Sequence, residues 1–307
     1  MAHAAEAPPP SERARALVEG GYDLHIHVAP DVPRRRIDDV TLAHRFGELR
    51  LAGFALKSHY TSTAERARVV SGVVPGVRVV GTLTLNRAIG GMNALAVEIA
   101  AREGARIVWM PTFDSPAETA GRVEPAPGVH VPIWAKLQHE LRALGVNVDP
   151  VPVTDADGAL LPETREVLAA IARHDLVLAT GHLGRDDAFA VVDGARAAGV
   201  RTIVVTHPEF PSQDFSLDDQ VALVERGCVM ERCLSTPHSG KTTYEHVFDG
   251  VRAVGVRNNL FSSDFGNPDY PAVEDGLALW ADRLLDAGFD ESEVREMIVD
   301  GSQRIAG

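Results

Sequence analysis

The chain has 307 residues, of which 45% are hydrophobic, and a formal net charge of −13. This length fits one large domain, since an α/β barrel commonly uses about 250 residues, and the acidic balance excludes a broad basic surface for nucleic acid. No apolar run approaches the roughly 18 to 20 residues of a transmembrane helix, and residues 1–21 lack the apolar core of a secretory signal. We therefore expect a cytoplasmic protein that acts on a small molecule and binds neither nucleic acid nor a membrane.

Strand-like and helix-like segments alternate along the chain after an N-terminal tail and short helix over residues 1–20. Strands are expected at 22–28, 53–59, 77–85, 105–112, 175–183, 201–209, 227–235 and 259–266. Helical patterns lie at 38–51, 64–73, 92–102, 188–198, 217–225 and 244–254, and two closing helices are expected at 272–285 and 291–305. Most of the strands have continuous apolar cores, as expected when both faces are buried. Eight such units predict an α/β fold, a (β/α)8 TIM barrel that forms a single domain over residues 21–307.

One long insertion interrupts this alternation between the fourth and fifth strands. Residues 113–174 are rich in Pro and Gly at first, and then predict a helix at 133–144, a hairpin at 151–161 and a helix at 163–173. Asp157-Gly158 is a typical hairpin turn. Because long insertions after barrel strands usually lie over the active-site mouth, we expect this insertion to form a lid or an oligomer contact. A homo-oligomer is therefore one possible state of the protein.

The first strand carries two histidines that share one face. His25 and His27 are two residues apart, so their side chains are expected to point the same way, with Asp23 on the same face. Leu24 and Ile26 are expected to point the other way, towards the helices. A lone histidine in such a run would more often be a structural core residue, but two imidazoles side by side are ready metal ligands.

Other polar residues end further predicted strands. Lys57 and His59 end the second strand, His182 the fifth, His207 the sixth and Asp264 the eighth. Because catalytic groups of these barrels lie at the C-terminal ends of the strands, we expect all of them to converge on one rim.

This arrangement resembles the amidohydrolase superfamily, which has His-x-His on strand 1, single histidines on strands 5 and 6, and Asp on strand 8. The resemblance implies that the metal ligands are His25, His27, His182, His207 and Asp264. Four imidazoles and a carboxylate favour zinc, as one or two divalent ions. The implied activity is a metal-dependent hydrolase, in which Asp264 is the catalytic base and an activated water attacks an amide, cyclic amide, lactone or phosphoester bond of a small molecule.

The chain departs from that superfamily at strand 4, where two-metal members usually carry a bridging carboxylated lysine or a glutamate. The strand ends Trp109-Met110-Pro111-Thr112, without such a group. Lys57 is the nearest substitute: as a carbamate it would be a catalytic metal ligand that bridges two ions. As an ammonium it would instead bind substrate or pair with Asp23.

Three residues are expected to contact the substrate. They are His59, Arg232 and His238, the last in the loop after strand 7. His59 could instead have a purely structural role. Arg232 would hold an anionic group of the substrate, or form a structural ion pair. Two other activities stay open on the same barrel. One is a lyase, such as a decarboxylase, with a single metal ion; the other is a metal-free aldolase with a Lys57 Schiff base, which four strand-end histidines disfavour.

Overall fold

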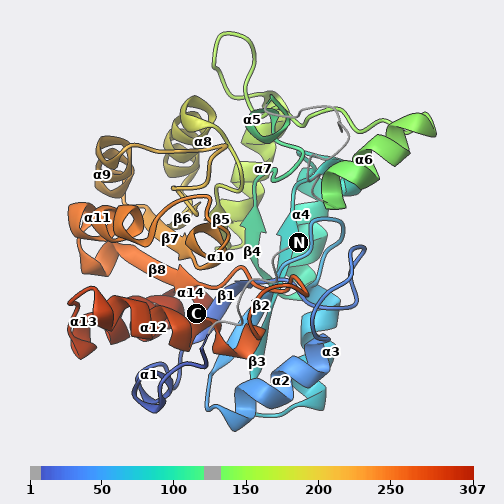
Figure 1. Ribbon diagram of the computed structural model, residues 1–307. Coiled ribbons are helices and arrows are strands. Elements are labelled where there is room, and N and C mark those ends of the chain that lie inside the picture. Colours follow the sequence, from blue (N-terminus) through green and yellow to red (C-terminus); the bar gives the residue numbers. More distant parts are fainter. Residues whose placement is uncertain (1–7, 121–132) are drawn as a thin grey trace.

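The computed structural model describes residues 8–120 and 133–307, and its core is a barrel of eight parallel strands (Figure 1). The strands are β1 (Tyr22–Ile26), β2 (Gly53–Leu56), β3 (Arg78–Thr84), β4 (Ala105–Trp109), β5 (Val177–Ala179), β6 (Thr202–Thr206), β7 (Val229–Cys233) and β8 (Asn259–Ser262). Each strand pairs with the next in chain order. A parallel bridge between Ile26 and Phe265 joins β1 to the segment after β8. The predicted (β/α)8 fold is confirmed.

Helices surround the barrel in chain order. They are α1 (Glu12–Leu17), α2 (Asp39–Glu48), α3 (Ala64–Val73), α4 (Ala94–Glu103), α5 (Pro116–Ala120), α6 (Ile133–Ala143), α7 (Pro162–Arg173), α8 (Arg185–Ala198), α9 (Leu217–Glu225), α10 (Ser235–His238), α11 (Tyr244–Val254), α12 (Gly276–Asp286), α13 (Glu291–Arg295) and α14 (Gly301–Ala306). Short 3-10 turns are η1 (Arg87–Ile89), η2 (Val256–Asn258) and η3 (Val273–Asp275), and η4 (Glu296–Asp300) is a π turn that joins α13 to α14. The helices predicted to start at 38 and 92 start slightly later, because Asp38 and Asn93 are N-caps whose side chains accept hydrogen bonds from backbone N–H groups.

The first strand is irregular, and this irregularity turns one side chain away from its expected direction. The pairing of β1 with β2 shifts register between Asp23 and Ile26. Leu24 therefore lies in the cluster of apolar side chains inside the barrel, whereas Ile26 packs among the outer helices. The expectation that Leu24 faces the helices is wrong, because a bulge of this kind breaks the simple alternation of a strand.

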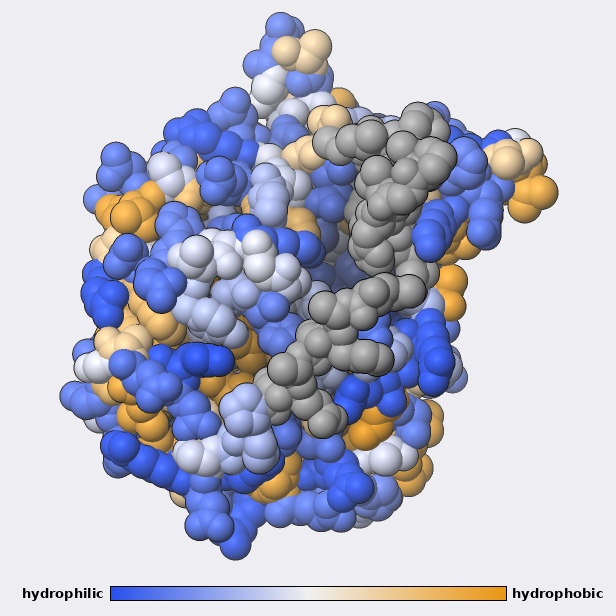
Figure 2. Space-filling view, viewed as in Figure 1, coloured by the Kyte–Doolittle hydropathy of each residue, from blue (hydrophilic) through white to orange (hydrophobic). Residues whose placement is uncertain are grey.

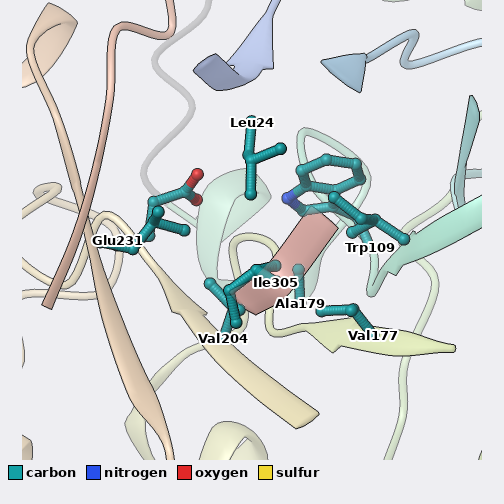
Figure 3. Close-up of a pocket in the computed structure, with 9 residues that line it drawn as sticks. Leu24, Trp109, Val177, Ala179, Val204, Glu231 and Ile305 are labelled. Atoms are coloured by element: carbon teal, nitrogen blue, oxygen red, sulfur yellow. The ribbon is translucent and has the colours of Figure 1, made fainter. Parts of the chain in front are cut away.

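The interior of the barrel below the strand ends is apolar and closed by the last helix. Figure 3 shows a small cavity there, with Trp109 and Glu231 on opposite sides and Ile305 of α14 near its base. Glu231 is almost completely buried among these apolar side chains. A carboxylate in such surroundings requires hydrogen-bonding partners, and Glu231 finds them at the edge of the functional site described below.

The chain between β4 and β5 forms α5, α6 and α7 within the described residues, and residues 121–132 of the predicted insertion lie outside them. The expected hairpin is reduced to one antiparallel bridge between Thr154 and Leu160, with Gly158 at a positive φ of 80° in the turn. In Figure 1, α6 projects from the body of the barrel. The face in Figure 2 is mainly hydrophilic, with hydrophobic side chains scattered along its edges. Over the described ranges, no helix has the length and apolar character needed to span a membrane.

Candidate metal centre

The closure of the barrel brings a carboxylate to the paired histidines of β1. Asp264 N donates a hydrogen bond to His25 O at 2.7 Å, and His27 N donates to Phe265 O at 2.8 Å. As a result, Asp264 Oδ1 lies 3.2 Å from Nε2 of both His25 and His27. These three side chains offer ligand atoms that all lie within 4.8 Å of one another. Two imidazoles and a carboxylate at this spacing fit the donor set of a zinc site.

Two of the residues at the strand ends have strained backbones. Asp264 has a φ of 52° and His207 a φ of 28°. Positive φ values are uncommon for residues other than glycine, and they concentrate at functional sites where the surrounding structure fixes them. Both side chains lie at the rim, Asp264 beside His25 and His27, and His207 beside His25 and His182.

Histidines from β5 and β6 complete the group. The His207 ring lies 5.9 Å from the His25 ring and 4.8 Å from the His182 ring, measured between centroids. The His27 ring stacks on His59 at 4.7 Å. The structure therefore brings together the strand-end histidines that the sequence places on β1, β2, β5 and β6.

Three of the four predicted histidine ligands form a hydrogen bond through Nδ1 to an outer group, whereas His182 Nδ1 faces a carboxylate without forming one. His25 Nδ1 lies 3.2 Å from Glu231 Oε2, His27 Nδ1 3.1 Å from Lys57 O, His182 Nδ1 3.4 Å from Glu118 Oε2, and His207 Nδ1 3.2 Å from Gln213 Nε2. Gln213 Oε1 is buried and has no partner among the described residues, so a rotated amide would accept from His207 Nδ1–H. When Nδ1 donates to an outer acceptor, Nε2 is left with a free lone pair for a metal.

Lys57 lies inside this cluster rather than at its edge. Its Nζ is 2.8 Å from His25 Nε2 and 5.1 Å from the centre of the Trp109 ring. Burial lowers the pKa of Lys57, and the charges of Asp264 and Glu231 oppose that shift. Asp23 Oδ1 accepts a hydrogen bond from Ser263 N at 3.0 Å, and Oδ2 has no partner among the described residues. The pairing of Lys57 with Asp23, one of the alternatives for an ammonium, is therefore not found.

The electrostatics of the cluster favour neutral imidazoles at His27 and His207 and an ionised carboxylate at Asp264. Burial, followed by the positive charge of Arg35, lowers the pKa of His27 to about 3. Burial likewise holds the pKa of His207 well below its usual value. Burial alone would raise the pKa of Asp264, but the neighbouring His25 and His27 keep it well below the usual range. These are the protonation states that metal ligands require.

Two carboxylates behind the histidines were missed by the sequence interpretation. Glu231 also accepts a hydrogen bond from Ser262 Oγ at 2.9 Å, and Cys233 Sγ lies 3.4 Å from His25 Nδ1. Glu118 reaches His182 from α5, well beyond the end of β4. The inward side of β7 could have indicated Glu231 through strand alternation, whereas Glu118 stands in an irregular insertion without a signal.

The candidates for substrate contact lie in different surroundings. His59 is half-buried beside His27, and its Nδ1 is 2.9 Å from Thr112 Oγ1. His238 is half-buried at the end of α10, with its ring 5.1 Å from Tyr270 and 5.8 Å from Phe265. Both therefore lie near the mouth of the barrel.

Arg232 points away from the site, which corrects its predicted role in substrate binding. It is fully buried, pairs with Glu209, and donates to Gln220 Oε1 at 2.7 Å and Asn259 Oδ1 at 2.9 Å. Because Glu231 faces the barrel interior, the next residue of β7 faces the helices. Burial lowers the pKa of Arg232 to about 9. Its structural alternative, a buried ion pair, is what the contacts support.

Replacement of Arg232 by methionine is expected to lower the free energy of unfolding by about 3 to 5 kcal/mol, because Glu209 would stay buried without its counter-charge. Urea unfolding followed by circular dichroism would measure this loss. The double variant Glu209→Gln with Arg232→Met should recover much of it. Unchanged stability together with weakened substrate binding would instead return Arg232 to the binding site.

Comparisons with known proteins agree with this architecture. The model of DUF6282, a family of unknown function, matches residues 20–231. No curated protein matches the chain in sequence. An amidohydrolase and the probable dipeptidase PvdM, both from Pseudomonas aeruginosa, are each 11% identical to it with TM-scores of 0.60; the matches cover 96% of this chain and 98% and 97% of theirs.

An amidohydrolase from Burkholderia multivorans is 16% identical, with a TM-score of 0.55 over 93% of this chain and 98% of its own. At these identities the likeness is one of fold. The family model, in contrast, spans most of the chain and includes β1 to β6 with all five strand-end histidines. The chain therefore belongs to the DUF6282 family and has the (β/α)8 barrel fold that these amidohydrolases share.

Proposed function

We propose that this protein is a metal-dependent hydrolase that acts on a small molecule at an amide, cyclic amide, lactone or phosphoester bond. The observation that carries the proposal is the common orientation of His25, His27, His182 and His207, each with Nδ1 against an outer group. Core histidines with a purely structural role have no reason to direct all four Nδ1 atoms to outer groups around one rim. Zinc ligands are held in this way, and the outer groups fix both tautomer and ring direction.

Within this proposal, His25, His27 and Asp264 hold one divalent ion, with zinc as the best match for the donors. His182 and His207 offer two further nitrogens for a second ion or for the substrate. Lys57, as a carbamate, would supply the bridging carboxylate that the end of β4 lacks, and its amine already lies against His25. A bound ion supplies Lewis acidity, which lowers the pKa of water and polarises a substrate oxygen.

The side chains of the chain itself divide the remaining work. Asp264 points one carboxylate oxygen at the two β1 histidines and accepts a hydrogen bond from Ser235 Oγ at 2.6 Å with the other. An ionised carboxylate in this position can accept a proton from the attacking water and return it to the leaving group. His59 and His238, near the mouth of the barrel, would contact the substrate.

A single-metal lyase is the second candidate, and one observation favours it. Among the described residues, only one of the compact groups of potential ligands combines two histidines with Asp264, and it has three members. A site with one ion and a bare Lys57 ammonium would suit a reaction, such as decarboxylation, in which the lysine charge stabilises a developing anion.

Metal content and its removal test the proposal. We expect the purified protein to contain one or two zinc ions per chain by elemental analysis, and chelation followed by dialysis to abolish hydrolysis of a panel of amides, lactones and phosphoesters until zinc is restored. A ratio near two supports the Lys57 bridge, and a ratio near one supports a single-ion site. A protein without metal, or one whose hydrolysis survives full chelation, would contradict the proposal.

A further inference from the structure

We propose that the substrate carries a carboxylate group, which binds the ammonium group of Lys241 at the mouth of the barrel. This inference rests on the proposed hydrolase function and names the substrate class of the same site. Lys241 lies after α10, in the segment that follows β7, and its backbone N donates a hydrogen bond to Thr236 O at 3.1 Å. The residue is exposed, so a ligand can reach it.

The position of Lys241 connects it to the metal centre. Its Nζ lies 4.0 Å from the centre of the Phe210 ring, a typical cation–π contact. The same ring lies 4.7 Å from the ring of His207 and 5.4 Å from that of His182. Phe210 therefore contacts both the lysine and two predicted metal ligands, and Lys241 stands directly beside the site.

Within the part of the chain that the structure describes, Lys241 contacts the Phe210 ring and forms no ion pair. The carboxylates whose charges act on Lys241 are Asp264 and Glu118. Asp264 belongs to the metal ligands and Glu118 faces His182 at 3.4 Å. Both carboxylates therefore have other partners, and the Lys241 ammonium could pair with a carboxylate of the substrate.

The choice of lysine at this position is unusual for the chain. The sequence contains 30 Lys and Arg residues, of which only three, Lys57, Lys136 and Lys241, are lysines. Arginine thus supplies almost all positive charge, and two of the three lysines lie at the candidate site. A lysine is a compact point charge, whereas arginine offers a planar fork. A single ammonium can pair with one carboxylate as a point charge and does not need the planar geometry of a guanidinium.

Two ligand pairs that differ by one carboxylate test the inference on the metal-loaded protein. Calorimetry would compare acetate with glutarate, and kcat/KM would be compared for 4-nitrophenyl acetate and mono-4-nitrophenyl glutarate. We expect the additional carboxylate to strengthen binding and raise kcat/KM by about 10- to 100-fold in the wild type. Lys241→Met should abolish this gain, and Lys241→Arg should retain part of it.

Lys136→Met is the matched control, since Lys136 is an exposed lysine on α6, and it should keep the full gain. An equal gain in Lys241→Met and the wild type, or no gain in the wild type, would overturn the inference. Failure of the proposed function looks different, because both esters would then be hydrolysed without dependence on metal or not at all. Calorimetry of glutarate binding, compared between the wild type and Lys241→Met, still reports on Lys241 in that case.

Discussion

Replacement of His27 by alanine is expected to weaken metal binding by more than about 10²-fold and to reduce hydrolysis to the background rate, while the barrel stays folded. Loss of a group behind a ligand already costs 10- to 100-fold in metal affinity, and His27 is itself a proposed ligand. Its Nε2 lies 3.2 Å from Asp264 Oδ1, so its removal opens one side of the cation site. Elemental analysis after dialysis, with circular dichroism to verify the fold, would measure both effects.

His25→Ala should give the same loss of metal, with a larger cost in stability. His25 is fully buried, and its removal would leave the buried Glu231 without the imidazole at 3.2 Å. His44→Ala is the matched control, because His44 is exposed on α2 and should leave metal content unchanged. Full metal occupancy and turnover in either β1 variant would show that the ligand assignment is wrong.

The convergence of the site could be predicted from sequence because it depends on one property of the fold. Parallel strands of a barrel end at the same rim, so residues at strand ends meet without any knowledge of their contacts. His25, His182 and Asp264 lie far apart in the chain and were placed together on that basis. The prediction needed only the approximate ends of the strands, and it tolerated strands that the structure shows to be shorter, such as β5.

The side-chain directions were harder to predict, for two opposite reasons. On β1, strict alternation was assumed, and the register shift between Asp23 and Ile26 sends Leu24 into the barrel. On β7 the side chains do alternate. Strict alternation there predicts that Glu231 faces the barrel interior and that Arg232 faces the helices. A bulge depends on tertiary pairing and leaves no clear mark in a single sequence.

Groups that act from loops could not be predicted at all. Glu118 approaches His182 from α5, within an insertion whose course no periodic pattern describes. Lys241 follows a short helix, α10, that begins where the strand was expected to continue. Both positions are fixed by packing of loops over the barrel mouth, which depends on the whole fold rather than on local sequence.

Replacement of Asp264 by asparagine is expected to lower turnover by at least about 10²-fold while most of the metal remains bound. Loss of a general base typically costs 10²- to 10⁴-fold in rate, and an amide cannot accept the proton that a carboxylate accepts. The histidines of β1, β5 and β6 would still hold the ion. Ser235→Ala is a suitable control, since it removes only the 2.6 Å hydrogen bond to Oδ2 and should cost much less.

The alternative is that Asp264 has a purely structural role. Its backbone N–H donates to His25 O and so connects the segment after β8 to β1. Asparagine keeps that backbone bond and nearly the same shape, so a structural role predicts altered stability with little change in rate. Turnover and metal content measured on the same sample, beside a urea unfolding curve, separate these cases. Turnover close to that of the wild type, with metal bound, would remove Asp264 from the mechanism and favour the single-metal lyase, in which no water needs to be deprotonated.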